Sequence, residues 1–142
     1  MKIEIINCDQ AQRWDDIVKS FEDHDVYYLN GYTEGFKIHG DGQPILIYME
    51  DDGVRAINAV MKRTLSGIPD MEDAPVGKEN FDICTPYGYG GFLIEGTLSD
   101  KMAGAYRDFC VENNIVSEFV RFNPMTDNQA KCGNLYDIVP LG

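Results

Sequence analysis

A short segment rich in glycine and tyrosine, residues 82–92, restricts the possible folds of this chain more than any other. It reads Asp-Ile-Cys-Thr-Pro-Tyr-Gly-Tyr-Gly-Gly-Phe, a strand-like run followed by three glycines within four positions. Glycine reaches backbone conformations with positive φ and lets the main chain approach a ligand or another segment closely. The segment therefore predicts a strand that ends in an irregular turn, either a purely structural one or one that binds substrate through Tyr87, Gly88, Tyr89, Gly90 and Gly91.

Two arginines and one glutamate lie in segments that otherwise read as apolar strands. Arg63 and Arg121 each stand at the end of such a strand, where a guanidinium either pairs with a carboxylate or faces an anionic ligand. Glu118 is a mid-strand acid on the opposite strand face from Arg121, because side chains alternate along a strand. A mid-strand carboxylate can serve as a general base, so Glu118 is the candidate catalytic residue. An ion pair between Glu118 and Arg63 is the structural alternative.

The pattern of apolar residues predicts strands and helices in the order β-α-α-β-β-β-α-β, with a possible final strand. Asp9 and Asn30 suit the N-caps of the first two helices, and residues 97–100 resemble a capping box for the third. Two strand-like runs joined by Asp-Asp-Gly predict a hairpin, and residues 66–80 read as a mobile loop beside the site. The predicted strands cover residues 2–7, 43–50, 54–64, the start of 82–92 and 115–122, with residues 136–141 as a candidate last strand.

Two of these segments carry a family resemblance. The run DICTPYGYGG followed by IVSEFVRFNP resembles the first half of the Fem-type, GNAT-like acyltransferases, the group of the peptidoglycan-bridge aminoacyltransferases. HDVYYLNGYTEGF and QPILIYMEDDGVRAINAVMKR fit the same group, so the resemblance runs from about residue 26 to about residue 128. It implies a GNAT-like α/β fold, with a mixed sheet flanked by helices on both faces. It also implies that the turn tyrosines and Arg121 line a substrate cleft.

Length and composition set further limits. The 142 residues suffice for a single GNAT-like domain, whereas Fem-type proteins usually contain two such halves, so we expect residues 1–142 to be the N-terminal half of a longer chain. The formal net charge of −12 argues against direct nucleic-acid binding by this piece. The N-terminus lacks an apolar export signal and no apolar run approaches the length of a membrane span, so a cytoplasmic location is expected.

The four cysteines are far apart in the sequence and show neither zinc-ligand spacing nor a redox motif. We therefore expect reduced thiols and no metal site. Cys84, beside the glycine turn, is better explained as a small buried residue than as a nucleophile.

The cofactor remains open. Acetyl-CoA-dependent GNAT enzymes carry a Q/R-x-x-G-x-G/A turn at a helix N-terminus, and here Thr85 stands three residues before Gly88. The favoured function is a Fem-like acyltransferase domain that binds a small polar or anionic acceptor amine, with a second GNAT-like half completing the transfer. The alternatives are a stand-alone N-acyltransferase that uses a CoA thioester and a non-catalytic binding module.

Overall fold

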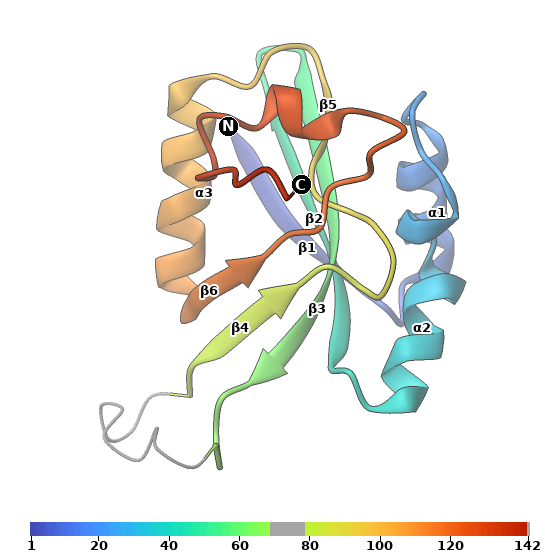
Figure 1. The fold of residues 1–142 in the computed structure, drawn as a ribbon. Coiled ribbons are helices and arrows are strands. Elements are labelled where there is room, and N and C mark those ends of the chain that lie inside the picture. Colours follow the sequence, from blue (N-terminus) through green and yellow to red (C-terminus); the bar gives the residue numbers. More distant parts are fainter. Residues whose placement is uncertain (69–78, 142) are drawn as a thin grey trace.

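A mixed β-sheet runs through the chain, and helices pack on both of its faces (Figure 1). The computed structural model describes residues 1–68 and 79–141. The sheet has the strand order β1-β2-β3-β4-β6, and β5 pairs with β3 beside this path. Its strands are β1 (Lys2–Asn7), β2 (Gln43–Asp51), β3 (Val54–Thr64), β4 (Phe81–Cys84), β5 (Leu93–Glu95) and β6 (Ile115–Phe119).

The predicted hairpin forms the centre of the sheet. Strands β2 and β3 are the longest, and their antiparallel register brings Asp51 opposite Val54. Both residues of the connecting turn have positive φ, 47° at Asp52 and 79° at Gly53. Asp-Gly turns of this kind have the twist that suits a two-residue hairpin. Local sequence therefore fixes the register of the two longest strands, which contribute residues to both cores.

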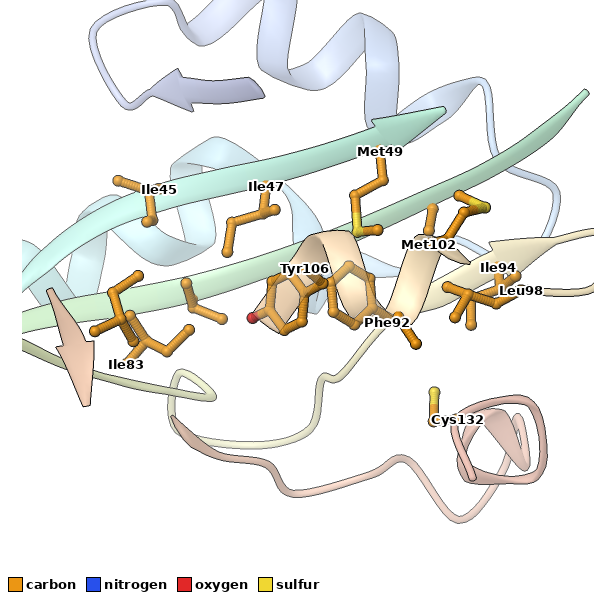
Figure 2. Close-up of a cluster of buried hydrophobic side chains, with 14 residues drawn as sticks. Ile45, Ile47, Met49, Ile83, Phe92, Ile94, Leu98, Met102, Tyr106 and Cys132 are labelled. Carbon is orange, nitrogen blue, oxygen red and sulfur yellow. The ribbon is translucent and has the colours of Figure 1, made fainter. Parts of the chain in front are cut away.

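Opposite faces of the sheet are covered by different helices. Helices α1 (Ala11–Lys19) and α2 (Asn30–His39) lie on one side, and α3 (Asp100–Glu112) lies on the other (Figure 1). Alternate residues of β2 point to each side, so the sheet has two cores. The α3 core includes Phe92 and Tyr106, whose rings meet edge to face with centroids 5.0 Å apart (Figure 2). This arrangement confirms a mixed α/β fold with helices on both faces.

The helix ends differ in detail from the predictions. The N-cap of α1 is Gln10 and not Asp9, and its side chain makes no capping bond. Asn30 is the first residue of α2, and the carboxylate of Asp15 accepts a bond of 2.9 Å from its backbone N–H. Ser99 caps α3 by accepting a bond from Met102 N–H, so the predicted box starting at residue 97 is displaced. Which residue caps a helix depends on tertiary contacts or on a choice between neighbouring hydroxyl groups. The sequence alone does not decide between these candidates.

Other differences concern the second half of the chain. β6 ends at Phe119, earlier than predicted, and residues 136–141 form no strand. β5 and a short 3-10 helix, η2 (Asn128–Lys131), were not predicted. Most of the loop predicted over 66–80 lies outside the described residues. Among the helices that are described, none is both long and apolar enough to cross a bilayer.

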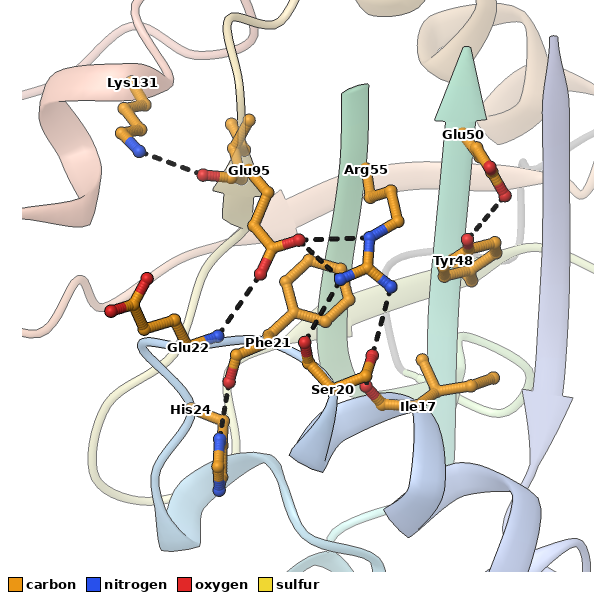
Figure 3. Close-up of polar contacts among 11 residues, drawn as sticks. Ile17, Ser20, Phe21, Glu22, His24, Tyr48, Glu50, Arg55, Glu95 and Lys131 are labelled. Atoms are coloured by element: carbon orange, nitrogen blue, oxygen red, sulfur yellow. Dashed lines mark hydrogen bonds and ion pairs between the residues drawn. The ribbon is translucent and has the colours of Figure 1, made fainter. Parts of the chain in front are cut away.

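An ionic network holds β5 against β3 and the end of α1 (Figure 3). The Arg55 guanidinium donates to the Glu95 carboxylate, with Nε 3.0 Å from Oε2, and also to Ser20. The central guanidinium carbon of Arg55, Cζ, lies 4.6 Å from the centroid of the Phe21 ring. The Arg55 contact holds the pKa of Glu95 below its ordinary value. A strand of only three residues is thereby fixed at its register.

Candidate functional site

The site begins where two parallel strands end side by side. β4 and β6 pair in parallel, with Cys84 opposite Phe119 at their carboxyl ends. Beyond the strands, the Thr85 N–H donates to Phe119 O over 3.0 Å, and the Arg121 N–H donates to Thr85 Oγ1 over 3.0 Å. In α/β sheets, ligands bind outside the carboxyl ends of parallel strands. This edge is therefore the favoured position for a ligand.

A pocket of about 240 Å³ opens at this edge, here called the carboxyl-end pocket. Four of the predicted site residues, Arg63, Tyr87, Gly88 and Arg121, contribute to its wall. The remaining lining residues are Asp41, Met61, Cys84, Thr85, Pro86 and Phe119. Its size suits a small molecule and its wall mixes aromatic rings with charged groups.

The two arginines of the pocket differ in their partners. Arg63 forms a two-point ion pair with Asp82 of β4, with Nε 2.9 Å from Oδ1 and the terminal nitrogen 2.5 Å from Oδ2. The alternative ion pair from Arg63 to Glu118 is therefore wrong, because alternation places Glu118 on the other face. No carboxylate within residues 1–68 and 79–141 forms an ion pair with Arg121, which is exposed. Among the described residues, Arg121 is thus the arginine of the pocket that forms no direct ion pair.

Cys84 lines the pocket as a protonated thiol. Burial raises its pKa, and the charge of Arg63 offsets that effect only in part. Only the thiolate is an effective nucleophile, so this environment does not activate the sulfur. Cys84 is half-buried in the pocket wall and not fully buried as predicted.

Packing explains the glycines of the turn. Gly88 has φ of 108°, and a Cβ there would lie 2.6 Å from Cε1 of Tyr27. Gly91 has φ of 89° and would meet the Phe122 ring at 2.8 Å. Gly90 is nearly enclosed, and its carbonyl accepts a bond of 2.9 Å from the Asn128 amide. These positions require glycine for close approach to other side chains, whether or not a ligand binds.

Tyr87 and Tyr89 point to different surroundings. Tyr87 is 77% exposed at the rim of the pocket, near the ring of Phe36 at a centroid distance of 6.4 Å. Tyr89 packs edge to face on Tyr27 at 5.8 Å and does not line the pocket. The structure therefore brings Tyr87 together with the two arginines in the pocket wall. Tyr89, Gly90 and Gly91 do not line the pocket.

Asp41 is a site residue that the sequence analysis missed. It follows α2, and its Oδ2 lies 3.0 Å from Nδ1 of His39. The next residue, Gly42, has φ of 123°, and a Cβ there would lie 2.7 Å from Lys62 O. That close approach to β3 brings the Asp41 carboxylate to the pocket wall. The Gly-Asp-Gly sequence predicts a turn at residues 40–42. The sequence does not predict that this turn lies close to β4 in the folded chain.

Glu118 lies away from this pocket, on the sheet face that α3 covers. Its carboxylate accepts hydrogen bonds from Asn58 Nδ2 at 2.8 Å, Tyr106 OH at 2.8 Å and Tyr136 OH at 2.9 Å. Burial raises the pKa of Glu118 against the opposing effect of these three donors. The structure thus does not bring Glu118 together with Arg63, Tyr87 or Arg121.

The glycine turn lacks the setting of the acetyl-CoA pattern, as the sequence analysis expected. The glycine turn is separated from α3 by β5, so its amides do not lie at a helix N-terminus. Within the described ranges, no three histidine, cysteine or acidic side chains gather as metal ligands. The structure defines a mixed α/β protein with a small charged pocket at a parallel strand pair. Comparison of the chain with family models, with curated proteins and with solved structures finds no match.

Proposed function

We propose that this chain is a GNAT-like domain of a Fem-type acyltransferase that binds a small anionic acceptor amine in the carboxyl-end pocket. One observation carries the proposal: the guanidinium of Arg121, which forms no ion pair with a carboxylate of the described residues, lies in a pocket at the carboxyl ends of the parallel strands β4 and β6. The order of helices and strands and the mixed sheet support the GNAT-like assignment.

The wall residues suit an acceptor that carries both an anionic group and an amine. A guanidinium binds carboxylate or phosphate through two parallel N–H bonds, which fixes the orientation of the ligand as well as its charge. Asp41 then supplies a carboxylate in the same pocket, where it can accept a proton from the attacking amine. In this proposal Asp41 takes the proton-accepting role that the sequence favoured for Glu118.

The aromatic side chains complete the pocket. Phe119 is 63% exposed and Tyr87 is 77% exposed, so both present ring surface to a bound molecule. Exposed aromatic rings beside charged groups are common in sites that bury the carbon skeleton of a polar ligand. The acyl donor and the remaining transfer chemistry come from a second GNAT-like half.

A CoA thioester is less well supported as the donor. The pyrophosphate of such a donor is held by amides at a helix N-terminus. Here the first residue of α3 is Asp100, and the acidic side chain of Asp100 occupies the first turn. Negative charge at that position opposes a pyrophosphate.

The proposal is tested by mapping amide shifts in nuclear magnetic resonance spectra during titration with O-phosphoethanolamine. Ethanolamine, which has the same amine but lacks the phosphate, is the matched control. We expect O-phosphoethanolamine to shift the amides of Thr85, Tyr87 and Arg121, with no such shifts from ethanolamine. Equal shifts from both compounds, or shifts confined to other parts of the chain, would contradict an anion-selective acceptor pocket.

A further inference from the structure

Glu118 is a carboxylate whose direct partners are all neutral. Asn58 of β3, Tyr106 of α3 and Tyr136 of the C-terminal segment donate to its two oxygens over 2.8–2.9 Å. No lysine, arginine or histidine of the described residues forms an ion pair with it. Buried charges in proteins are normally paired, because their loss of hydration is otherwise uncompensated.

Basic side chains on the elements around Glu118 are engaged elsewhere. Lys62 of β3, on the same sheet face as Asn58, holds its ammonium 4.0 Å from the centroid of the Phe81 ring. Arg63 lies on the other face of the sheet and pairs with Asp82. Arg107 of α3 donates a hydrogen bond of 2.5 Å to the backbone carbonyl of Asn134. Neither guanidinium therefore supplies the missing positive charge.

The side-chain oxygen of Asn58, in the same cluster, lacks a hydrogen-bond donor among the described residues. Asn58 is 1% exposed, and its Nδ2 is committed to Glu118. Its Oδ1 is buried and accepts no hydrogen bond from any residue in the described part of the chain. A buried amide oxygen without a donor is costly. The carboxylate without a positive partner and the amide oxygen without a donor thus belong to two side chains, Glu118 and Asn58, that are joined by a hydrogen bond.

A pocket of about 310 Å³ opens beside this cluster, here called the α3-side pocket. Glu118, Tyr106 and Tyr136 contribute to its lining, together with the apolar side chains of Ile115 and Leu135. Asp137 and Arg107 also line it, so two carboxylates stand against one guanidinium. The pocket is separate from the carboxyl-end pocket, since the two share no lining residue.

We infer that the α3-side pocket binds a small organic ammonium ion, with Glu118 as its counter-ion. An ammonium group has up to three donors and one positive charge, which matches an ionised carboxylate with remaining acceptor capacity. Ile115 and Leu135 would contact the carbon chain of the ligand. This site goes beyond the proposed acyltransferase function and does not depend on it.

The competing explanation is that Glu118 holds a proton and needs no counter-ion. The other titratable and charged groups around it come from α3, η2 and the C-terminal segment; they are Tyr106, Arg107, Cys110, Cys132, Tyr136 and Asp137. Burial raises the pKa of Cys110 to about 11, so its thiol carries no charge at neutral pH. The two explanations differ in whether a cation binds.

The test is a titration of the 142-residue chain with n-butylammonium chloride at pH 8, followed by amide shifts in nuclear magnetic resonance spectra. The uncharged analogue 1-butanol controls for the carbon chain. We expect saturable shifts around residues 115–118 and 135–137 with the ammonium only. Glu118→Gln should weaken binding at least about tenfold, because it removes one partner of a charge pair. Glu112→Gln, at the exposed end of α3, should bind as the wild type does.

A second measurement keeps the test valid if Glu118→Gln disturbs the fold. Intermolecular nuclear Overhauser effects between the butyl chain and the methyl groups of Ile115 and Leu135 are expected in the wild type, and their absence at saturation would contradict binding in this pocket. Absence of saturable shifts in the wild type, equal shifts from 1-butanol, or unchanged affinity in Glu118→Gln would each overturn the inference.

Discussion

The guanidinium of Arg63 and the carboxylate of Asp82 form a two-point ion pair across strands β3 and β4, with Nε 2.9 Å from Oδ1. The pair lies at one wall of the carboxyl-end pocket and compensates the charge of Arg63. Arg121, which follows β6 and also lines that pocket, has no such partner among the described residues. The pocket therefore has one arginine that maintains the sheet and one that is available to an anion.

Replacing Glu118 by glutamine should stabilise the protein, and more so at higher pH. The pKa of Glu118 is raised above its ordinary value of 4.5, so the folded state disfavours the ionised form. The contribution of Glu118 to the free energy of unfolding is then fully present below pH 4.5 and is lost as the pH rises through the raised pKa. Glutamine keeps the shape and cannot ionise, so its advantage should grow over that interval.

This prediction is checked by urea denaturation of both proteins at several pH values between about 4 and 8, the range over which a raised carboxyl pKa acts. Glu112→Gln removes the same charge from an exposed site and provides the control. A difference in unfolding free energy between Glu118→Gln and wild type that stays constant with pH, or decreases as the pH rises, would contradict the conclusion that burial raises the pKa of Glu118.

Replacing Gly88 by alanine should destabilise the glycine turn by about 1–3 kcal/mol. The φ of 108° is strained for any L-residue, and the added Cβ would lie 2.6 Å from the Tyr27 ring. Gly104→Ala is the matched control, since no atom lies within 4 Å of that Cβ and the residue is inside α3. There alanine should raise stability by up to about 1 kcal/mol. Thermal unfolding of the two variants measures the contrast, and equal effects would argue against a packed turn.

The sequence was most informative where local rules decide the structure. The Asp-Gly turn and the β-rich runs on either side of it predict the β2–β3 hairpin, which the structure confirms. Alternation along a strand does separate Glu118 from Phe119, which line different pockets, whereas Arg121 lies beyond the end of β6, so strand period does not determine its position. These features need no knowledge of distant segments.

Features that depend on contacts between distant segments were missed or misplaced. β5 has only three residues and is held by the Arg55–Glu95 pair across 40 positions of sequence. Residues 136–141 read as a strand because they are apolar, yet the sheet edge at β6 is not extended by them. Asp41 reaches the pocket only because Gly42 packs on β3. No local pattern encodes these three relationships.

Acetyl-CoA should bind this chain weakly or not at all. Thr85 stands where the acetyl-CoA pattern has a basic or amide side chain, and β5 separates the glycine turn from α3. Isothermal titration calorimetry with acetyl-CoA checks this expectation. Binding in the low micromolar range, about −8 kcal/mol, would instead favour a stand-alone CoA-dependent enzyme.

The most direct test of the anion-binding pocket is the affinity of O-phosphoethanolamine for three arginine variants, measured by titration calorimetry at low salt. Arg121→Ala should weaken binding by about tenfold or more, since a charge-assisted contact contributes about 1.5–3 kcal/mol. Arg13→Ala removes the same charge from α1, where Arg13 pairs with Glu4, and should leave the affinity unchanged. Arg63→Ala should lower stability more than affinity, because Arg63 is already paired with Asp82. A folded Arg121→Ala protein that binds O-phosphoethanolamine as tightly as the wild type would contradict the proposed site.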